Sequence, residues 1–302
     1  MSHALPTADP TATARRYGGQ SSSAPLRTVM VRLPAPPATG EEWGPFAYPR
    51  PVDHAETEAE HAAFRRLLAD AGVEVLVEGP DQPGLLDGIF AYDPSFMTDR
   101  GAILLRLGKD LRLPEVANHE ASYAAFGIPV LGRIEAPGTV DGGDMVWLDQ
   151  QTLAVGRGYR TNDEGIRQLR AILGPVGVGV LEVALPHWHG AGECLHLMSM
   201  ISPVAERTAV VYLPLMATAF VQVLERRGWE FIEVPDAEFD TLGCNVLPLG
   251  GGTVVVCEGS PVTRSRLEAA GFDVRAYKGD ELSHNRAGGP TCLTRPIWRE
   301  VG

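Results

Sequence analysis

The hydrophobic and polar positions follow two periods along the chain, and the same two-part pattern returns several times. In residues 56–71, Phe64, Leu67 and Leu68 lie at helical spacing, which predicts an amphipathic helix. A glycine follows at 72, as in a left-handed helix C-cap, and a strand-like Val-Glu-Val-Leu-Val run comes next. This arrangement of helix, glycine and strand recurs, and the predicted helices span 56–71, 114–126, 163–173, 216–227 and 261–270.

A β-hairpin is predicted ahead of each helix after the first. The hairpins span 96–107, 144–155, 195–213 and 245–257, and a last segment at 291–299 would complete the first unit. Repeated strand–strand–helix–strand units favour a closed ring, because closure leaves no exposed sheet edge. An open α/β sheet with hairpin insertions is the alternative.

Composition supports many short elements. Of the 302 residues, 34 are Gly and 24 are Pro, which argues against a helical bundle. We expect a disordered, Ser/Ala/Thr-rich leader over 1–24 and one catalytic domain over 25–302. No apolar run reaches the length of a membrane span, so no membrane association is expected.

The net charge and the cysteines narrow the partners and the compartment. A net charge of −12 makes nucleic acid an unfavourable partner, whereas a small cationic substrate is compatible with it. The four cysteines form no CxxC pair and do not suggest a disulfide scaffold. These features predict a cytoplasmic protein with reduced thiols at positions 194, 244, 257 and 292.

Chemistry-bearing residues gather in four segments at element ends, namely 92–99, 140–144, 194–199 and 288–294. Equivalent segments of a ring converge on its axis, which would bring a thiol, an imidazole and carboxylates together. The Gly-Gly pair at 288–289 would let the backbone approach a ligand closely. Taken singly, each segment also has a structural reading: a buried cysteine, a packed histidine, an Asx turn or a loop cap.

Other motifs do not support a metal or a cofactor. His187 and His189 have the spacing of a chelating pair, but no third ligand stands at a recognisable distance, and we predict no metal. The glycines at 250–252 lack the GK[ST] of a phosphate loop, and no GxSxG elbow is present. No cofactor is therefore expected.

Together, the four segments resemble the guanidino-group-modifying enzymes, which comprise arginine deiminases, amidinotransferases and, with the closest likeness, dimethylarginine dimethylaminohydrolases. The resemblance covers about 31–299. It implies a five-bladed α/β propeller of ββαβ repeats, also called a pentein, and hydrolysis of an Nω-methylated arginine to citrulline and an alkylamine. The implied partner is a small guanidino amino acid, and the chain would be a monomer or homodimer.

The resemblance also implies roles for individual residues. Cys292 matches the nucleophile, His196 the general acid/base, and Asp141 an acid that contacts the guanidinium. Asp99 matches the acid that ends the family's Phe-x-x-Asp segment, and Arg112 and Arg160 match the arginines that bind the α-carboxylate. The full set of implied substrate-binding residues is Asp93, Phe96, Asp99, Arg112, Arg160 and Arg286.

Two departures from the family pattern affect the choice of substrate. Thr98 stands where dimethylarginine dimethylaminohydrolases typically have Glu, which leaves the guanidino substituent open. Met198 replaces the Asp of the deiminase His-x-Asp, which counts against a plain arginine deiminase. An arginine deiminase, an amidinotransferase and a non-catalytic guanidino-binding protein are the alternative functions.

Overall fold

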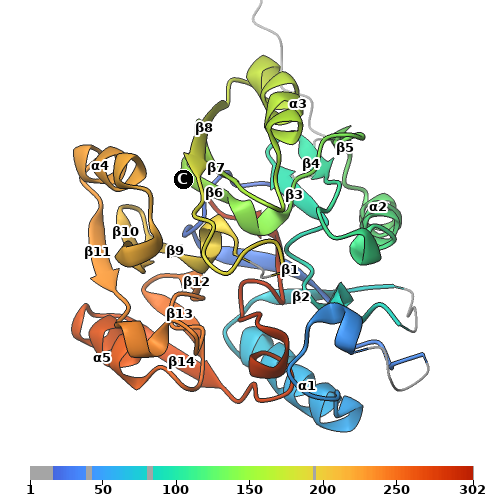
Figure 1. Cartoon of the computed structure of the whole chain (residues 1–302), viewed down its shortest axis with the longest axis vertical. Helices are drawn as coiled ribbons and strands as arrows, with labels where there is room; N and C mark the ends of the chain where they lie inside the picture. The colour runs from blue at the N-terminus through green and yellow to red at the C-terminus, as the bar shows by residue number, and fades with distance from the viewer. Residues whose placement is uncertain (1–15, 39–42, 80–83, 193–194, 302) are drawn as a thin grey trace, which may run out of the picture.

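Five three-stranded sheets, each accompanied by one helix, stand around a common axis (Figure 1). The computed structural model describes residues 16–38, 43–79, 84–192 and 195–301. In every sheet the central strand pairs antiparallel with one neighbour and parallel with the other. The predicted five-bladed α/β propeller of ββαβ repeats is confirmed.

The blades follow chain order. Blade one joins β15 (Arg295–Arg299), β1 (Leu26–Arg32), α1 (His54–Asp70) and β2 (Glu74–Glu78); blade two has β3 (Ser95–Thr98), β4 (Gly101–Leu104), α2 (Glu115–Phe126) and β5 (Val130–Arg133). Blade three has β6 (Met145–Asp149), β7 (Thr152–Arg157), α3 (Asp163–Leu173) and β8 (Gly179–Ala184). Blade four has β9 (Ile201–Ala205), β10 (Thr208–Val211), α4 (Thr218–Arg226) and β11 (Glu230–Glu233); blade five has β12 (Leu247–Gly250), β13 (Thr253–Cys257), α5 (Pro261–Ala269) and β14 (Asp273–Tyr277).

The last strand closes the ring on the first. Strand β15 pairs antiparallel with β1, with Met30 opposite Arg295, so the C-terminal segment completes blade one as predicted. Helices and strands pack through apolar residues that are wholly buried, such as Val29 on β1 and Phe64 on α1. The fold therefore places the start of each inner strand, β15, β3, β6, β9 and β12, in corresponding positions of the ring.

Glycines end four helices in the predicted way. Gly72, Gly127, Gly228 and Gly271 follow α1, α2, α4 and α5 with φ of 81°, 68°, 73° and 92°, the left-handed region that suits glycine. Helix α3 differs, because a 3-10 turn continues its chain and the left-handed residue comes later, at Gly177 (φ 83°). Asn162 caps α3 by accepting a hydrogen bond from the Gly165 amide.

The predicted disordered leader is wrong for residues 16–24, which pack on the ring. The Gly18 amide donates to the Ile297 carbonyl oxygen (2.8 Å), and the Gly19 amide donates to Asp99 Oδ1 (2.7 Å). Gly19 lies so close to Arg299 that a Cβ there would come within 1.9 Å of the Arg299 carbonyl oxygen. The small residues therefore permit close backbone contact. Residues 1–15 lie outside the described residues.

Among the described residues, no helix is long and apolar enough to cross a membrane.

Candidate active site

At least one chemistry-bearing residue precedes the inner strand of each blade. Asp93 comes before β3, Asp141 before β6, His196 before β9, Asn245 before β12 and Cys292 before β15. Sequence analysis identified this position in four blades and missed Asn245 in the fifth. The repeat itself carried the signal, because blade five has the same strand start as the others.

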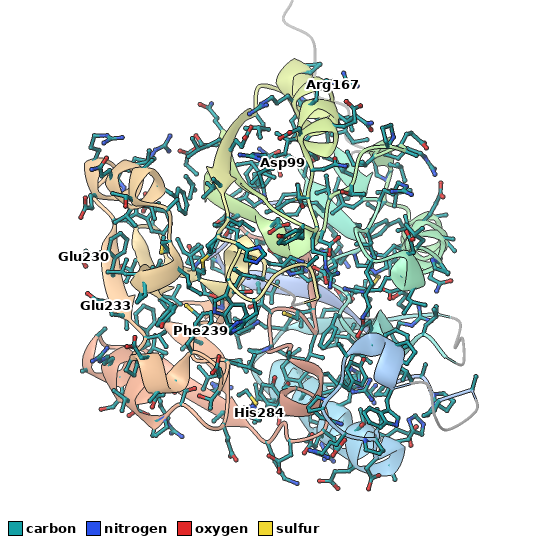
Figure 2. The ribbon with its side chains drawn as sticks, viewed as in Figure 1. Asp99, Arg167, Glu230, Glu233, Phe239 and His284 are labelled. Atoms are coloured by element: carbon teal, nitrogen blue, oxygen red, sulfur yellow. The ribbon has the colours of Figure 1, made fainter. Side chains whose placement is uncertain are left out.

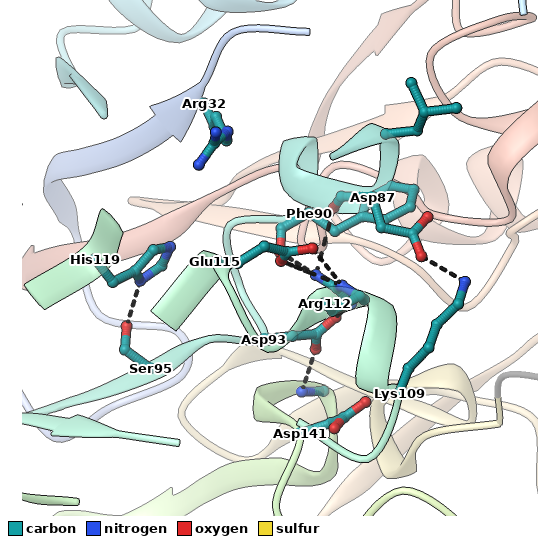
Figure 3. A network of polar contacts seen from close by, with 12 residues as sticks. Arg32, Asp87, Phe90, Asp93, Ser95, Lys109, Arg112, Glu115, His119 and Asp141 are labelled. Carbon is teal, nitrogen blue, oxygen red and sulfur yellow. Dashed lines mark hydrogen bonds and ion pairs between the residues drawn. The ribbon is translucent and has the colours of Figure 1, made fainter. Parts of the chain in front are cut away.

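Asp93 is a buried carboxylate with two strong donors. Arg112 Nη1 donates to its Oδ2 (2.6 Å), and the Gly143 amide donates to its Oδ1 (2.9 Å) (Figure 3). Burial by itself would raise the pKa of Asp93, but the charges of Arg112 and His196, with these hydrogen bonds, lower the pKa to about 2. Asp93 is therefore an anion throughout the neutral range.

Arg112 is occupied by protein acceptors. Besides Asp93, its Nε and Nη2 donate to Glu115 at 3.0 Å and 2.9 Å, and Nη2 also reaches the Phe90 carbonyl oxygen (3.1 Å) (Figure 3). Its side chain is only 3% exposed. The structure thus uses Arg112 to hold Asp93, which differs from the α-carboxylate contact that the resemblance implied.

Asp141 links the imidazole to a second arginine. His196 Nε2 donates to its Oδ2 (3.1 Å), and Arg160 Nη1 donates to the same oxygen (3.1 Å). The Gly108 amide donates to Oδ1 (2.7 Å). Because the carboxylate accepts from Nε2, it fixes the orientation of the His196 ring. Arg160 keeps 13% of its side chain exposed, so it can still meet a ligand.

The two glycines of the Asp-Gly-Gly-Asp segment permit this packing. A Cβ on Gly142 would come within 2.1 Å of the Tyr92 carbonyl oxygen, and one on Gly143 within 2.4 Å of His196 Nδ1. Neither contact is possible for a larger residue. The segment is therefore a close junction between the segments that carry Asp93, Asp141 and His196, not a hairpin turn.

Asp144 is hydrogen-bonded to the backbone of the segment that carries His196. Thr161 Oγ1 donates to its Oδ2 (2.6 Å), and the Leu197 amide donates to its Oδ1 (2.9 Å). Burial raises the pKa of Asp144 to about 6, although the His196 charge and the Thr161 hydrogen bond act against the rise. Its carboxyl group orients the backbone next to His196.

Cys292, which precedes β15 of blade one, is hydrogen-bonded to residues that precede the inner strands of blades two and five. The Tyr92 amide donates to its carbonyl oxygen (3.1 Å), which joins the cysteine segment to the residue before Asp93. Asn245 Nδ2 donates to its Sγ (3.1 Å). The glycines at 288 and 289 were expected to let backbone approach a ligand; a Cβ on them would clash with Phe90 and Asn245 side chains, at 2.2 Å and 2.6 Å.

Three predicted substrate-binding residues are not brought into this cluster. Asp99 lies in the β3–β4 turn (labelled in Figure 2) and accepts from the Gly19 amide. Phe96 packs in the core against Trp147, with ring centroids 5.4 Å apart. Arg286 is buried and donates to the Leu86 carbonyl oxygen (2.9 Å).

The sequence contains a second Phe-x-x-Asp segment, Phe90-Ala-Tyr-Asp93, and the structure favours it over residues 96–99. Asp93 joins Arg112 and Gly143, whereas Thr98 bonds within its own turn, donating to the Gly101 carbonyl oxygen (2.7 Å). The residue before the acid of this cluster is then Tyr92, not Thr98. The family's Glu is therefore still replaced at this position, by Tyr92 where the sequence analysis had named Thr98.

Three further polar residues lie next to this cluster and were not predicted. Lys109 Nζ donates to Asp87 Oδ2 (2.7 Å) (Figure 3). The Tyr48 hydroxyl donates to Asp87 Oδ1 (2.7 Å). Asp87 opens the segment that leads to Asp93, six residues earlier, so its place ahead of Phe90 was the available signal.

The described residues contain no group of three or more His, Cys, Asp or Glu that could hold a metal ion. His187 Nδ1 instead pairs with the Tyr159 hydroxyl (2.6 Å). Cys194, the first residue of the predicted 194–199 segment, lies outside the described residues.

A thiol, an imidazole and two carboxylates at the strand starts of a five-bladed α/β propeller define the class of guanidino-group-modifying enzymes. The model of the arginine deiminase family matches residues 86–219 and 212–299, and the chain belongs to this family.

Among its relatives, the N(G),N(G)-dimethylarginine dimethylaminohydrolase of Streptomyces coelicolor is 31% identical over 82% of this chain and 89% of its own length. The enzyme of the same name from Pseudomonas aeruginosa is 30% identical over 80% of this chain and 89% of its own. An arginine deiminase from Rhodococcus erythropolis is 27% identical, over 84% of this chain and 72% of its own.

Solved structures agree with this placement. The Pseudomonas aeruginosa dimethylarginine dimethylaminohydrolase, as a cysteine-to-serine variant in complex with citrulline, superimposes with a TM-score of 0.74. The match covers 90% of this chain and 100% of that chain, at 25% identity.

Proposed function

We propose that the protein hydrolyses the guanidino group of an Nω-methylated arginine, giving citrulline and an alkylamine. One observation carries this proposal: Asp93 and Asp141 are two buried carboxylates, Asp93 accepts from the amide of Gly143, two residues after Asp141, and His196 contacts Asp141 directly. Two relatives with about 30% identity are named dimethylarginine dimethylaminohydrolases, and a solved relative binds citrulline.

The carboxylates suit a guanidinium. This cation is planar and delocalised, and acids on two of its edges can align it through charge-assisted, bidentate hydrogen bonds. Asp93 stays ionised because Arg112 and the Gly143 amide stabilise its charge. Asp141 is proposed for the second edge. Holding the cation from both edges also fixes its carbon atom in front of the nucleophile.

Cys292 is the proposed nucleophile. Its thiolate attacks the guanidinium carbon and forms a C–S bond, giving a tetrahedral adduct. His196 gives a proton to the departing alkylamine as the C–N bond breaks, which leaves a covalent thiouronium. The same imidazole then takes a proton from water, the hydroxide adds to the carbon, and the C–S bond breaks to release the ureido product.

Arg160 is the proposed contact for the substrate α-carboxylate. It is partly exposed, whereas Arg112 is enclosed by Asp93 and Glu115. A fixed amino-acid end orients the guanidino end and reduces the entropy that is lost in reaching the transition state.

The test is a product assay over a panel of unsubstituted, monomethylated and asymmetrically dimethylated arginines. We expect citrulline together with methylamine or dimethylamine, and no product from Cys292→Ser. Absence of turnover with every methylated arginine would contradict the proposal. Activity that persists in Cys292→Ser would instead contradict the nucleophile.

The main alternative is an arginine deiminase, which would release ammonia from unsubstituted arginine. An amidinotransferase would transfer the amidino group to an added amine. Met198, a buried residue that follows two positions after His196, replaces an acid of the deiminase pattern. Identity to the named arginine deiminases is also lower, at 24% and 27% for two of them.

A protein that binds guanidino ligands without catalysis is the alternative from another class. Labelling of Cys292 by a haloacetamidine separates the two, because a reactive thiolate is modified rapidly and substrate protects it. We place the protein in the cytoplasm, since Cys244 and Cys257 are buried thiols that form no disulfide. A monomer or homodimer remains the expected assembly.

A further inference from the structure

Asn245 contacts the sulfur of the proposed nucleophile. Its Nδ2 lies 3.1 Å from Cys292 Sγ and donates to it. The contact crosses from blade five to blade one, since Asn245 precedes β12 and Cys292 precedes β15. Asn245 thus occupies in blade five the position that Asp93, Asp141 and His196 occupy in their blades.

The orientation of the amide follows from a second hydrogen bond. The Thr291 backbone N–H donates to Asn245 Oδ1 (3.0 Å), and a backbone N–H can only donate. The amide oxygen must therefore face Thr291, which turns the NH₂ group toward the sulfur. Asparagine supplies both functions at once, whereas aspartate would accept from Thr291 but offer no donor to Cys292.

The surrounding backbone holds Asn245 in place. Ser202 Oγ on β9 donates to the Cys244 carbonyl oxygen (2.6 Å) and accepts from the Val246 amide (3.3 Å), so both neighbours of Asn245 are fixed by one side chain. Gly289 leaves the space that the amide fills, because a Cβ there would lie 2.6 Å from Asn245 Cγ.

We propose that Asn245 is a further catalytic residue, whose amide directs Cys292 Sγ and stabilises its thiolate before and during attack. A hydrogen bond donated to a charged group favours the charged form. The fixed donor also removes rotational freedom from the sulfur, so that attack starts from one geometry. The catalytic role of Asn245 rests on the proposed function, whereas the stabilisation of the Cys292 thiolate does not.

The experiment measures alkylation of Cys292 by iodoacetamide against pH, with peptide mapping by mass spectrometry to separate it from the other cysteines. The variants are Asn245→Ala, which removes the donor, and Asn245→Asp, which keeps the Thr291 contact and replaces the donor with a negative charge. Thr241→Ala is the control, because it removes polar contacts to Ser260 and Glu238 in the same blade without touching Cys292.

We expect the pH of half-maximal alkylation to rise by about one unit in Asn245→Ala and further in Asn245→Asp, which slows labelling at neutral pH about tenfold. Thr241→Ala should match the native chain. In turnover of the preferred methylated arginine, kcat should fall at least about tenfold in Asn245→Ala, with KM little changed.

Alkylation profiles of the alanine and aspartate variants that coincide with that of the native chain would overturn the proposal, even where turnover falls, because the amide would then act elsewhere. If the native chain turns over no guanidino compound, the proposed function fails, and the alkylation profiles still test the Asn245 contact. Circular dichroism and thermal unfolding verify that each variant is folded before its profile is compared.

Discussion

Asp93 and Asp99 each end a Phe-x-x-Asp segment, and they lie at opposite ends of strand β3. Asp93, at the start of the strand, meets Arg112 and the Gly143 amide. Asp99, in the turn after the strand, meets the Gly19 amide of the N-terminal segment. The same residue types at the same spacing thus give a buried, charged carboxylate at one end of the strand. At the other end they give a carboxylate that holds the backbone of the N-terminal segment.

Strand β6 repeats the contrast. Asp144, immediately before it, is buried against Thr161 and the Leu197 amide, whereas Asp149, its last residue, forms an exposed ion pair with Arg227 (2.7 Å). The contacts of an aspartate therefore depend on whether it lies before or after the inner strand, more than on its residue type. Strand starts converge in this ring, while three of the hairpin turns line a cavity at the other end of the inner strands.

A search for the active site by cavity volume alone would select the end of the ring opposite to the Cys292 cluster. A cavity of about 890 Å³ is lined by the turns 149–151, 205–207 and 250–252 together with residues 20–25. None of the residues that line it belongs to the Cys292 cluster. Its walls carry neither a cysteine nor a histidine to activate a hydroxyl, so its size gives no chemical argument for catalysis.

A second nucleophile-like cluster shows that residue types are also insufficient. Ser95 Oγ lies 2.8 Å from His119 Nδ1, and His119 Nε2 lies 3.5 Å from Glu78 (Figure 3 shows the Ser95 contact). Burial raises the pKa of Glu78 to about 8 and lowers that of His119 well below its usual value. Both groups are buried and favour their neutral forms, so the cluster is part of the packing.

The largest effect is expected at the start of β3. Asp93→Asn should lower kcat/KM by about 10²–10³-fold, because the amide cannot neutralise the guanidinium. Arg112 keeps its bonds to Glu115, so the fold should persist. Steady-state kinetics and thermal unfolding measure the two effects, and activity close to the native level would contradict the site.

A smaller effect is expected at Arg160. Its replacement by alanine should raise KM for a methylated arginine about 10–100-fold, because a charge-assisted contact to the α-carboxylate is lost. Arg157→Ala, which removes only exposed ion pairs with Glu182 and Asp163, is the matched control. Equal KM values in the two variants would remove Arg160 from substrate binding.

The two ends of β6 should differ in their pH dependence. The pKa of Asp144 is raised in the folded chain to about 6, above its usual 3.8, so the folded state binds the extra proton and stability falls as pH rises from about 4 to about 6. Asp144→Asn should remove this decrease. Burial raises the pKa of Asp149, but its hydrogen bonds to Gln151, Thr152 and Arg227 together outweigh burial and lower the pKa, so its contribution to stability is lost only in acid.

Thermal unfolding of Asp144→Asn and Asp149→Asn between pH 3 and 7 measures this difference. The Asp144 variant should show a flatter dependence between pH 4 and 6 than the native chain. The Asp149 variant should follow the native curve closely there, because Asp149 is half exposed. Identical curves for the native chain and Asp144→Asn would contradict the raised pKa.

The smallest effect on activity is expected at Asp99. Asp99→Asn should leave kcat/KM within about twofold of the native value and lower stability by about 1 kcal/mol, because it weakens the Gly19 contact, which lies away from the Cys292 cluster. A loss of activity comparable to that of Asp93→Asn would restore Asp99 to the site and reverse the comparison.

Much of the fold was predictable because the same sequence features recur in each ββαβ unit. Helical spacing, C-cap glycines and hairpin turns gave all five helices to within two residues at each end, and closure by the last strand followed from the incomplete first unit. The N-terminal segment was misjudged, because Ser and Gly residues typical of disorder also permit the close contacts that Gly18 and Gly19 make.

The site was predictable as a set of segments more than as a set of contacts. The order Asp141, His196, Cys292 identified three strand starts. Sequence spacing could not choose between the two Phe-x-x-Asp segments, since both satisfy it. Nor could it show that Arg112 is enclosed by Glu115, although an acid three residues after an arginine at a helix start was a local signal.

The most direct test of the central claim is to quench the native enzyme rapidly in acid during turnover of a methylated arginine and analyse its peptides by mass spectrometry. The account predicts a thiouronium adduct on the peptide that contains Cys292, present during turnover and gone once substrate is exhausted. Steady production of citrulline with the adduct on another cysteine, or with none on Cys292 at any quench time, would contradict it.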